Sequence, residues 1–335
     1  MGDQVRFAVI GCGFMGSIHG HNIASSKHAD LVCCCDTDAA SATRLAQQTN
    51  APHTTTDFQA VISDPKIDAV VIATPTHNHA DLAVAAAAGG KHILQEKPMA
   101  TSVEECLAIE RAVAGAGVCM IIGFKFRFAR AVLAAREAVP EPLMLIGQGI
   151  YDAATATSGW VNDRGLSGGR LMSGMVHTVD LLRYLSRSEP LRVYAEGGNL
   201  MFENLDEPDN AVATVAFKNG VVGSVVNGTS GQSHWLSTWC TQVVGRRVNA
   251  TIHDHARRLQ LHRPDEPPAT PELFEDIENS HAVGTRPLLA EFLAAIRENR
   301  PPCPSPRDGT MSVLICRAIE QSMETATPQS IVVPD

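Results

Sequence analysis

Two short motifs near the start of the chain have the residue types and the spacing for hydride transfer. Residues 11–16 read Gly-Cys-Gly-Phe-Met-Gly directly after the apolar run 7–10, and residues 96–98 read Glu-Lys-Pro after the apolar segment 93–95. Glycines in this pattern allow a tight turn, the close approach of a pyrophosphate and close packing of the following helix. That helix offers unpaired N–H groups and the positive end of its dipole to phosphates. The first motif therefore predicts a dinucleotide site. The second motif supplies Lys97 as the expected acid and base of the proton transfer.

An acidic residue stands where the ribose of a dinucleotide would be bound. Asp36 follows the apolar run 29–35 and lies 20 residues after Gly16. A carboxylate at this place accepts hydrogen bonds from ribose hydroxyls and repels a 2′-phosphate, so it favours NAD over NADP. NADP stays open, because Thr37 and Arg44 can also meet a phosphate. The alternative is that Asp36 is an ordinary aspartate in a strand-end turn.

The chemistry expected of Lys97 follows from the surroundings that the motifs give it. An ammonium group in a crevice, facing a cationic nicotinamide, is disfavoured, so its pKa falls toward neutrality. The free amine then takes the hydroxyl proton as the hydride leaves. Pro98 restricts the backbone around Lys97 and helps to aim its side chain. The alternative is a surface lysine in an ordinary turn.

The composition describes a soluble globular protein, and the two motifs predict a small-molecule substrate. The 335 residues suffice for two domains, and 44% of them are hydrophobic and 19% charged. A net charge of −9 without a basic patch argues against a nucleic-acid partner. The chain shows no signal segment and no apolar run long enough to span a bilayer. We therefore expect a cytoplasmic protein that does not bind membranes.

Neither the thiols nor the histidines predict a metal site. Three of the nine cysteines stand at 33–35, in a strand expected to be buried, and fit small core residues in a reducing compartment. No two cysteines have the Cys-x₂-Cys spacing of a zinc site. The histidines and aspartate at 253–255, together with His262, suggest a metal, but a solvated strand end or loop is the favoured interpretation.

Strands and helices alternate from residue 5 to about residue 124. This alternation predicts a doubly wound parallel sheet that is covered by helices on both faces. Ligands of such sheets bind at the carboxyl ends of the strands. Nine residues follow predicted strands and are expected to converge on one crevice: Gly11, Asp36, Ala73, Thr74, Pro75, Glu96, Lys97, Pro98 and Lys125.

The pattern changes after residue 125, where strands dominate. Alternating apolar residues at 211–217 fit a sheet with one exposed face, and Asn219-Gly220 predicts a hairpin. We predict an α+β domain with a large, mainly antiparallel open sheet, so that the domains are 1–124 and 125–335. Its strands are expected at 144–151, 191–197, 210–217, 221–229, 235–244 and 249–253, and its helices at 129–138, 173–185, 287–298 and 308–325.

Motifs along nearly the whole chain resemble those of one enzyme family, the Gfo/Idh/MocA oxidoreductases, which include glucose-fructose oxidoreductase and inositol dehydrogenases. The resemblance implies an N-terminal Rossmann domain and a C-terminal α/β domain whose open sheet mediates a homodimer or homotetramer. It also implies NAD(P)-dependent oxidation or reduction at a secondary carbinol of a sugar, an inositol or a related cyclic polyol. The motifs are residues 11–16, Ala-Thr-Pro-Thr-His-Asn-His at 73–79, Glu-Lys-Pro at 96–98, Gly-Phe-Lys-Phe-Arg-Phe at 123–128, Gly168-Gly169, His177-x-x-Asp180, Asp-Asn-Ala-Val at 209–212 and Pro-Arg-Asp-Gly-Thr at 306–310.

By this resemblance Lys97 is the catalytic lysine and His177 assists it. Residues 173, 177 and 180 share one face of the predicted helix. The family commonly has Asp-x-Gly-x-His here, whereas this chain reads Ser-Gly-Met-Val-His at 173–177. Ser173 cannot supply the carboxylate that binds substrate hydroxyls or supports a charged histidine, so the usual polyol-binding scheme is incomplete. A core role for His177 is the alternative.

Further residues are assigned by their place in the motifs. Arg164 suits a carboxylate-bearing substrate, because a guanidinium group can donate two hydrogen bonds to one carboxylate. The alternative is that Arg164 is a solvated cation in a loop. Lys125 stands where many relatives carry asparagine; it adds a second positive charge near the nicotinamide or the substrate, or has a loop role. His79 contacts the nicotinamide ribose or begins a helix. The predicted cofactor-binding residues are Gly11, Gly13, Phe14, Met15, Gly16, Asp36, Thr37, Ala73, Thr74, Pro75, His77, His79, Glu96, Lys97 and Lys125; the predicted substrate-binding residues are Tyr151, Trp160, Asn162, Arg164, Ser173 and His177.

Three functions follow from these observations. The first is an NAD-dependent dehydrogenase of a sugar, inositol or related polyol. The second keeps the cofactor but acts on a carboxylated aromatic cis-dihydrodiol, as Ser173, Lys125 and Arg164 suggest. The third is a non-catalytic NAD(P)-bound sensor, against which the presence of both Lys97 and His177 argues.

Overall fold

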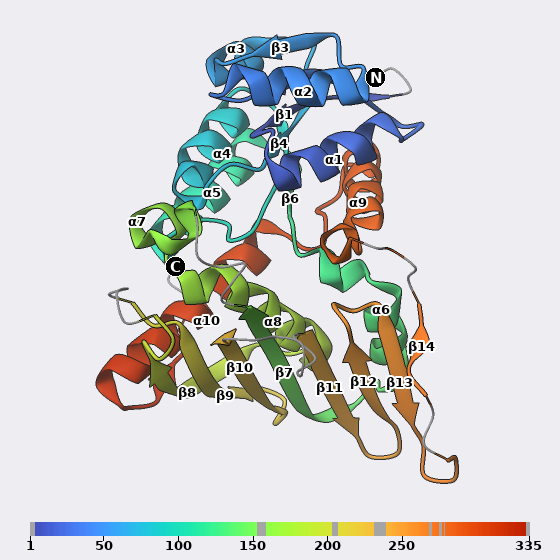
Figure 1. Cartoon of the computed structure of the whole chain (residues 1–335), viewed down its shortest axis with the longest axis vertical. Coiled ribbons are helices and arrows are strands. Elements are labelled where there is room, and N and C mark those ends of the chain that lie inside the picture. Colours follow the sequence, from blue (N-terminus) through green and yellow to red (C-terminus); the bar gives the residue numbers. More distant parts are fainter. Residues whose placement is uncertain are drawn as a thin grey trace. The chain divides into compact units, whose positions relative to one another are not determined.

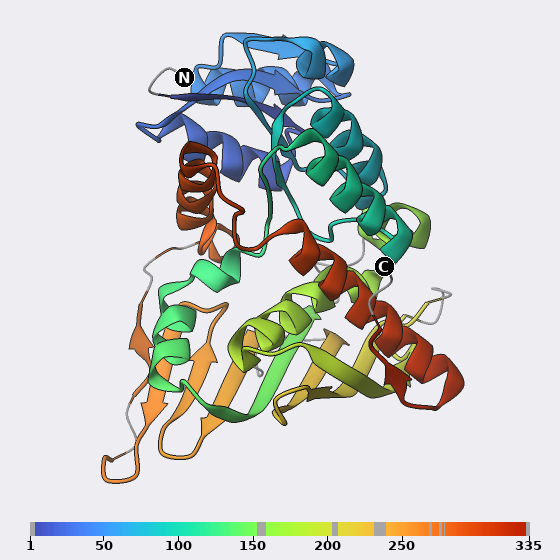
Figure 2. The same ribbon diagram turned by 180° about the vertical axis from the view of Figure 1, so that it is seen from behind.

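The computed structural model describes residues 4–152, 159–202, 207–230, 239–267, 270–274, 277 and 279–332. The chain forms two compact units, each with its own sheet (Figures 1 and 2). The first unit comprises residues 1–124 and 285–310, and the second comprises 125–284 and 311–335. A segment from the C-terminal part of the chain thus completes the N-terminal unit.

The first unit is built on a six-stranded parallel sheet with the order β3-β2-β1-β4-β5-β6. This order reverses direction between β1 and β4, and such a switch point is where doubly wound sheets bind their ligands. The predicted doubly wound parallel sheet is therefore confirmed. Its strands are β1 (Val5–Ile10), β2 (Ala29–Cys35), β3 (His53–Thr55), β4 (Ala69–Ile72), β5 (His92–Gln95) and β6 (Met120–Ile122).

Five helices connect these strands, and capping residues in the sequence mark several of their ends. Asp38 caps α2 by accepting from the amides of Ala40 and Ser41, and Ser102 forms a capping box with Glu105 at the start of α5. The helices are α1 (Phe14–Ala24), α2 (Ala39–Thr49), α3 (Phe58–Ser63), α4 (His79–Ala88) and α5 (Val103–Ala116), with the short turn η1 (Thr76–Asn78) before α4.

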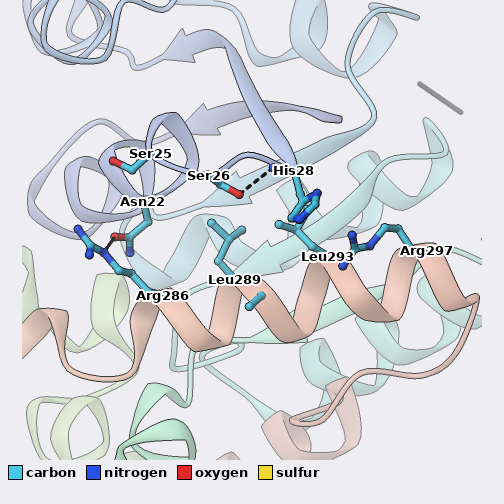
Figure 3. A pocket seen from close by; sticks show the side chains of 9 residues that line it. Asn22, Ser25, Ser26, His28, Arg286, Leu289, Leu293 and Arg297 are labelled. Atoms are coloured by element: carbon cyan, nitrogen blue, oxygen red, sulfur yellow. Dashed lines mark hydrogen bonds between the residues drawn. The ribbon is translucent and has the colours of Figure 1, made fainter. Parts of the chain in front are cut away.

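Helix α9 (Thr285–Glu298) completes the first unit by packing on α1. The Phe292 ring meets Phe7 of β1 edge-on, with centroids 6.1 Å apart, and Asn22 donates to the Thr285 hydroxyl at 2.9 Å. The two helices leave a hollow of about 240 Å³ between them (Figure 3). Since it is lined by the C-terminal end of α1, it lies at the opposite end of that helix from the glycine motif.

The second unit contains a nine-stranded sheet with the order β14-β13-β12-β11-β7-β10-β9-β8-β15. Among the described strands of this sheet, β7 and β10 alone pair in parallel, so the prediction of a mainly antiparallel sheet is confirmed. Residues 235–238 of the predicted strand 235–244 lie outside the described residues. The strands are β7 (Pro142–Asp152), β8 (Pro190–Gly198), β9 (Asn210–Phe217), β10 (Val222–Ser230), β11 (Trp239–Gly245), β12 (Asn249–His253), β13 (Arg258–His262), β14 (Glu272–Leu273) and β15 (Gln329–Ser330).

Helices cover one face of this sheet, as both views show (Figures 1 and 2). Helix α8 (Arg170–Ser186) begins three residues earlier than predicted and packs on β7 and β10. The guanidinium of Arg127 forms a buried pair with the carboxylate of Asp180, with nitrogen–oxygen distances of 2.9 and 2.6 Å. This pair fastens the turn η2 (Lys125–Phe128) to α8. The remaining helices are α6 (Arg130–Ala138), the short η4 (Trp160–Asn162), α7 (Arg164–Ser167) and η5 (Ser280–Ala282), and α10 (Pro306–Thr325).

Among the described residues, no helix has both the length and the apolar character that a bilayer-spanning segment requires.

Candidate active site

The glycine motif forms the turn between β1 and α1, and two of its glycines are dictated by close contacts. Gly11 has a φ of +92°, and a Cβ added to it would lie 2.6 Å from the carbonyl oxygen of Ala73. A Cβ on Gly16 would lie 1.8 Å from the carbonyl oxygen of Gly11, so the helix touches the turn itself. A Cβ on Gly13 would meet nothing within 4 Å. The open space at Gly13, at the start of a helix without a side-chain cap, fits a bound pyrophosphate.

The predicted ribose-binding aspartate lies beside this turn. The Asp36 carboxylate accepts from the Cys12 amide at 2.7 Å and from the Asp38 amide at 2.9 Å. These two bonds hold the half-buried carboxylate at the end of β2, next to the glycine motif. Thr37 is exposed, and the exposed Arg44 side chain donates to Ser41.

Replacing Asp36 by asparagine is expected to weaken the preference for NAD. Asp36→Asn keeps an oxygen for the Cys12 amide, while it removes the charge that repels a 2′-phosphate. We expect the ratio of kcat/KM for NAD to that for NADP to fall on the order of tenfold, which corresponds to about 1.4 kcal/mol. Steady-state kinetics with both cofactors measures this ratio. An unchanged ratio would show that Asp36 does not select the cofactor.

Lys97 lies directly after β5, at the same carboxyl edge of the parallel sheet. The amide of Glu96 still donates to Ile72 of β4 at 2.9 Å, which fixes where the strand ends. The Lys97 side chain is partly buried, and this burial lowers its pKa, while the negative charge of Glu96 acts in the opposite direction. The bond between Lys97 and Pro98 is a cis peptide. A lysine with a lowered pKa has a larger share of the neutral amine, which is the form that takes up a proton.

A buried histidine that the sequence analysis did not single out binds the neighbour of Lys97. The His19 Nε2 lies 2.8 Å from an oxygen of the Glu96 carboxylate, and the side chains are only 1% and 8% exposed. The second carboxylate oxygen accepts from the Lys97 amide at 3.2 Å. A signal for His19 exists in the sequence, because the buried positions 16, 19, 20 and 23 follow the helical repeat on the inner face of α1.

The segment after β4 places its two histidines differently. His77 is exposed, whereas His79 is buried with its Nδ1 2.8 Å from the Pro98 carbonyl oxygen and its Nε2 2.9 Å from that of Thr74. Burial lowers the pKa of His79, so the ring is neutral at pH 7 and donates to one of these carbonyls. Both ring nitrogens therefore face the protein, and His79 joins the Thr74 segment to the Lys97 segment.

The other predicted residues lie in the second unit. Lys125 is buried in η2, and its ammonium donates to the carbonyl of His281 and lies 5.2 Å from the centre of the Phe126 ring. Arg164 pairs with the buried Glu320 at 3.2 Å, and Asn162 accepts from Arg170. The polar groups of Arg164 and Asn162 thus already have protein partners.

Aromatic side chains surround the predicted histidine of α8. The buried His177 ring lies 5.0 Å from Phe126 and 6.1 Å from Trp239, measured between centroids. The indole N–H of Trp239 donates to the Tyr151 hydroxyl at 3.3 Å. A Cβ on Gly174 would lie 2.5 Å from the Tyr151 ring, so the shifted glycine of this chain makes room for that tyrosine. Trp239 was not identified from the sequence, because it begins a strand far from the motifs.

Ser173 and Trp160 are both partly buried, and the Ser173 amide donates to Gly169 at 3.1 Å in the first turn of α8. The sequence thus leaves a short hydroxyl where the family commonly has a carboxylate.

Two of the residues that suggested a metal have other partners. Asp254 pairs with Arg257 at 2.7 Å, and His255 stacks on Trp239 with centroids 6.5 Å apart. Within the described ranges, no three or more histidine, cysteine, aspartate or glutamate side chains are grouped to hold a metal ion.

Comparison with known proteins agrees with this geometry. Residues 5–124 match the model of an oxidoreductase family with an NAD-binding Rossmann fold, and residues 141–331 match the C-terminal alpha/beta domain of the same family. The chain belongs to the Gfo/Idh/MocA oxidoreductase family. It is therefore an NAD-dependent oxidoreductase, and the predicted family and NAD cofactor are confirmed.

Similar proteins in this family share the whole length of the chain. The scyllo-inositol 2-dehydrogenase (NAD(+)) of Bacillus subtilis (strain 168) is 29% identical, over 98% of this chain and 96% of that protein. The myo-inositol 2-dehydrogenase of Thermotoga maritima is 26% identical, over 96% of each. A levoglucosan dehydrogenase, solved in complex with NADH and levoglucosan, matches 98% of this chain and 99% of its own with 25% identity and a TM-score of 0.85.

Proposed function

We propose that this protein transfers a hydride between NAD and a secondary hydroxyl-bearing carbon of a sugar, an inositol or a related cyclic polyol. Lys97 is the acid and base of this reaction, and His177 assists it. The observation that carries the proposal is Lys97 itself, a lysine of lowered pKa at the carboxyl edge of the sheet that holds the glycine motif. Relatives named as inositol and levoglucosan dehydrogenases support the substrate class.

The first unit holds the cofactor in this proposal. The N-terminus of α1 and the open space at Gly13 take the pyrophosphate, and Asp36 takes the adenosine ribose. NAD supplies the hydride acceptor when it is bound. Phe14, 60% exposed, offers an apolar face at the start of α1.

Lys97 performs the proton transfer. As a neutral amine it accepts the proton of the substrate hydroxyl while the hydride leaves the hydroxyl-bearing carbon, which gives an ammonium group at Nζ and the carbonyl product. In the reverse direction the ammonium returns this proton to the oxygen. The lowered pKa gives Lys97 a larger share of the neutral amine than an ordinary lysine has.

In this proposal an aromatic cluster of the second unit takes part in substrate binding, and its members are Phe126, Tyr151, His177 and Trp239. Aromatic rings offer apolar faces to the C–H groups of a pyranose or cyclitol ring. We place the Tyr151 hydroxyl, which accepts from the Trp239 indole N–H, at an oxygen of the substrate. It can donate to that oxygen, whereas the carboxylate absent at Ser173 would accept from a substrate hydroxyl.

The alternative of a carboxylated cis-dihydrodiol needs a cation for its carboxylate. Arg164 already binds Glu320, and Lys125 donates to the His281 carbonyl, so such a substrate would have to displace a protein partner. These contacts favour the neutral polyol.

NADH formation across a substrate panel tests the proposal. The panel holds scyllo-inositol, myo-inositol, levoglucosan, glucose and a carboxylated cis-dihydrodiol, each with NAD. We expect turnover of a neutral cyclic substrate. Turnover of the dihydrodiol alone would move the assignment to the second substrate class, and tight NAD binding without turnover of any compound in either direction would support the sensor.

We also propose a homodimer or homotetramer through the sheet of the second unit. The face opposite α8 exposes apolar side chains on neighbouring strands, among them Val212 at 57% and Val222 at 49%. Exposed apolar area of this kind marks a protein interface. Val212→Lys is expected to yield monomers in light-scattering measurements, with Lys218→Glu as a surface control. The buried free thiols at 33–35 fit the reducing cytoplasm, where we place the protein.

A further inference from the structure

The segment that carries Lys97 is held on both sides by buried histidines. Before Lys97, the Glu96 carboxylate binds His19 of α1 at 2.8 Å. After Lys97, the Pro98 carbonyl oxygen faces the Nδ1 of His79 in α4 at 2.8 Å. Both imidazoles are 1% exposed, so neither contact is a loose surface pairing.

We propose that His19 and His79 are positioning residues, which fix the charge of Glu96 and the backbone at Pro98 so that the Lys97 amine is set for proton transfer. Because it concerns Lys97, this inference rests on the proposed function.

The Glu96 carboxylate has a closely defined place. One oxygen faces His19 and the other accepts from the Lys97 amide at 3.2 Å. A Cβ on Gly123 would come within 3.1 Å of three atoms of the carboxyl group, so the residue directly after β6 packs against it. An anion held this near to Lys97 stabilises the ammonium form and raises the pKa that burial lowers.

Titratable groups of the first unit lie around this anion. The charge of Glu96 raises the pKa of Lys97. The charges of Glu96 and Lys97 also shift the pKa of His79, in opposite directions. His19 touches Glu96 from the opposite side. A substitution of His19 is therefore expected to change the pKa of Lys97 through its effect on the Glu96 carboxylate.

His19 also ties the lysine to the cofactor motif. It stands on α1, whose first turn begins at Gly13, and the same helix face carries Gly16 against the Gly11 carbonyl. The His79 ring lies between the carbonyls of Pro98 and Thr74 and donates to one of them, and Thr74 follows Ala73, whose carbonyl oxygen leaves no room for a Cβ at Gly11. The turn that binds the pyrophosphate and the segment that carries Lys97 are thus joined by two separate contacts.

The competing explanation is that the two histidines only fill the core. A purely structural role predicts a loss of stability without any change in the titration of Lys97. The pH dependence of Lys97 reactivity separates the two explanations, and it can be measured without cofactor or substrate.

The test is the rate of Lys97 acylation in the apoprotein, mapped by mass spectrometry as a function of pH. Glu96→Gln removes the anion, so the midpoint for Lys97 should move about one unit to lower pH. His19→Leu should move it in the same direction, because a buried carboxylate without its donor is less stable as an anion. His19→Gln keeps a hydrogen-bond donor near the place of Nε2, so its midpoint for Lys97 acylation should stay close to that of the wild type.

His19→Asn is the matched variant in case His19→Leu does not fold, since its shorter amide does not reach Glu96. An unchanged midpoint in His19→Leu or His19→Asn, in a protein that folds, overturns the role of His19. His79→Leu should leave the charge of Glu96 in place and lower kcat with little change in KM for NAD; an unchanged kcat overturns its role.

A double-mutant cycle completes the test in turnover. We expect His19→Leu to lower kcat ten- to hundredfold, about the loss that misplacing a catalytic group causes. In a Glu96→Gln background the same change should cost little, because the two residues act as one unit. Fully additive effects would contradict the inference. The proposed function fails separately, if Lys97→Ala turns over substrate at the wild-type rate.

Discussion

Lys97→Met is expected to abolish turnover and at the same time to make the protein more stable. Removing a general base lowers kcat by about 10²- to 10⁴-fold, and methionine offers no group that takes its place. NAD affinity should stay within about threefold of the wild type, because the glycine motif and Asp36 are untouched.

The gain in stability follows from the sign of the pKa shift. Burial lowers the pKa of Lys97, so the folded state binds this proton less tightly than the unfolded chain does. The free energy of unfolding therefore falls as the pH drops from 10.5 through the folded-state pKa, and at neutral pH the lysine is a cost to the fold. Methionine keeps an unbranched side chain of similar length and should add about 1 kcal/mol.

Thermal unfolding and steady-state kinetics measure the two effects on one sample. Lys66→Met, at an exposed turn of the same unit, is the control and should change neither activity nor stability by much. A Lys97→Met protein that is inactive and also less stable would mean that Lys97 supports the fold rather than the reaction.

The second large effect separates two glycines that stand three positions apart. Gly16→Ala should destabilise the first unit by about 3 kcal/mol, because its Cβ would lie 1.8 Å from a backbone oxygen that cannot move aside easily. Gly13→Ala should change stability by less than about 1 kcal/mol, since its Cβ meets nothing within 4 Å. Gly13→Ala should instead lower the affinity for NAD on the order of tenfold or more, because the added methyl group occupies the space of the pyrophosphate.

Chemical denaturation and calorimetric titration with NAD distinguish these variants. Gly115→Ala is a suitable control, as its Cβ also meets nothing and it lies in α5, away from the glycine motif. Wild-type NAD affinity in Gly13→Ala would show that the pyrophosphate is not bound against this turn.

The local signals of the sequence were strong enough to predict the first unit. Apolar runs that end in glycine, aspartate or Glu-Lys-Pro give parallel strands with polar carboxyl ends, and the structure has Gly11, Asp36 and Lys97 at one edge of the sheet. The short β3 and α3 were not expected, because three and six residues carry too little periodicity. The return of α9 to the first unit depends on contacts such as Phe7 with Phe292, which no local pattern contains.

The partners of the site residues were much harder to predict. His79 was assigned to the cofactor or to a helix start, and only the folded chain shows its ring between two carbonyl groups. The bond of His19 to Glu96 joins residues 77 positions apart, and that of Trp239 to Tyr151 joins residues 88 positions apart. Such pairs arise from the packing of whole elements, so single-sequence patterns point at most to one member.

Rescue of Lys97→Ala by added amines tests the central claim most directly. If the Lys97 amine takes the substrate proton, then small primary amines that enter the space it leaves should restore NADH formation. The rate should rise with the concentration of the free base, and more basic amines should act at higher pH. Wild-type turnover by Lys97→Ala without any amine would contradict the account, because another group would then be moving the proton.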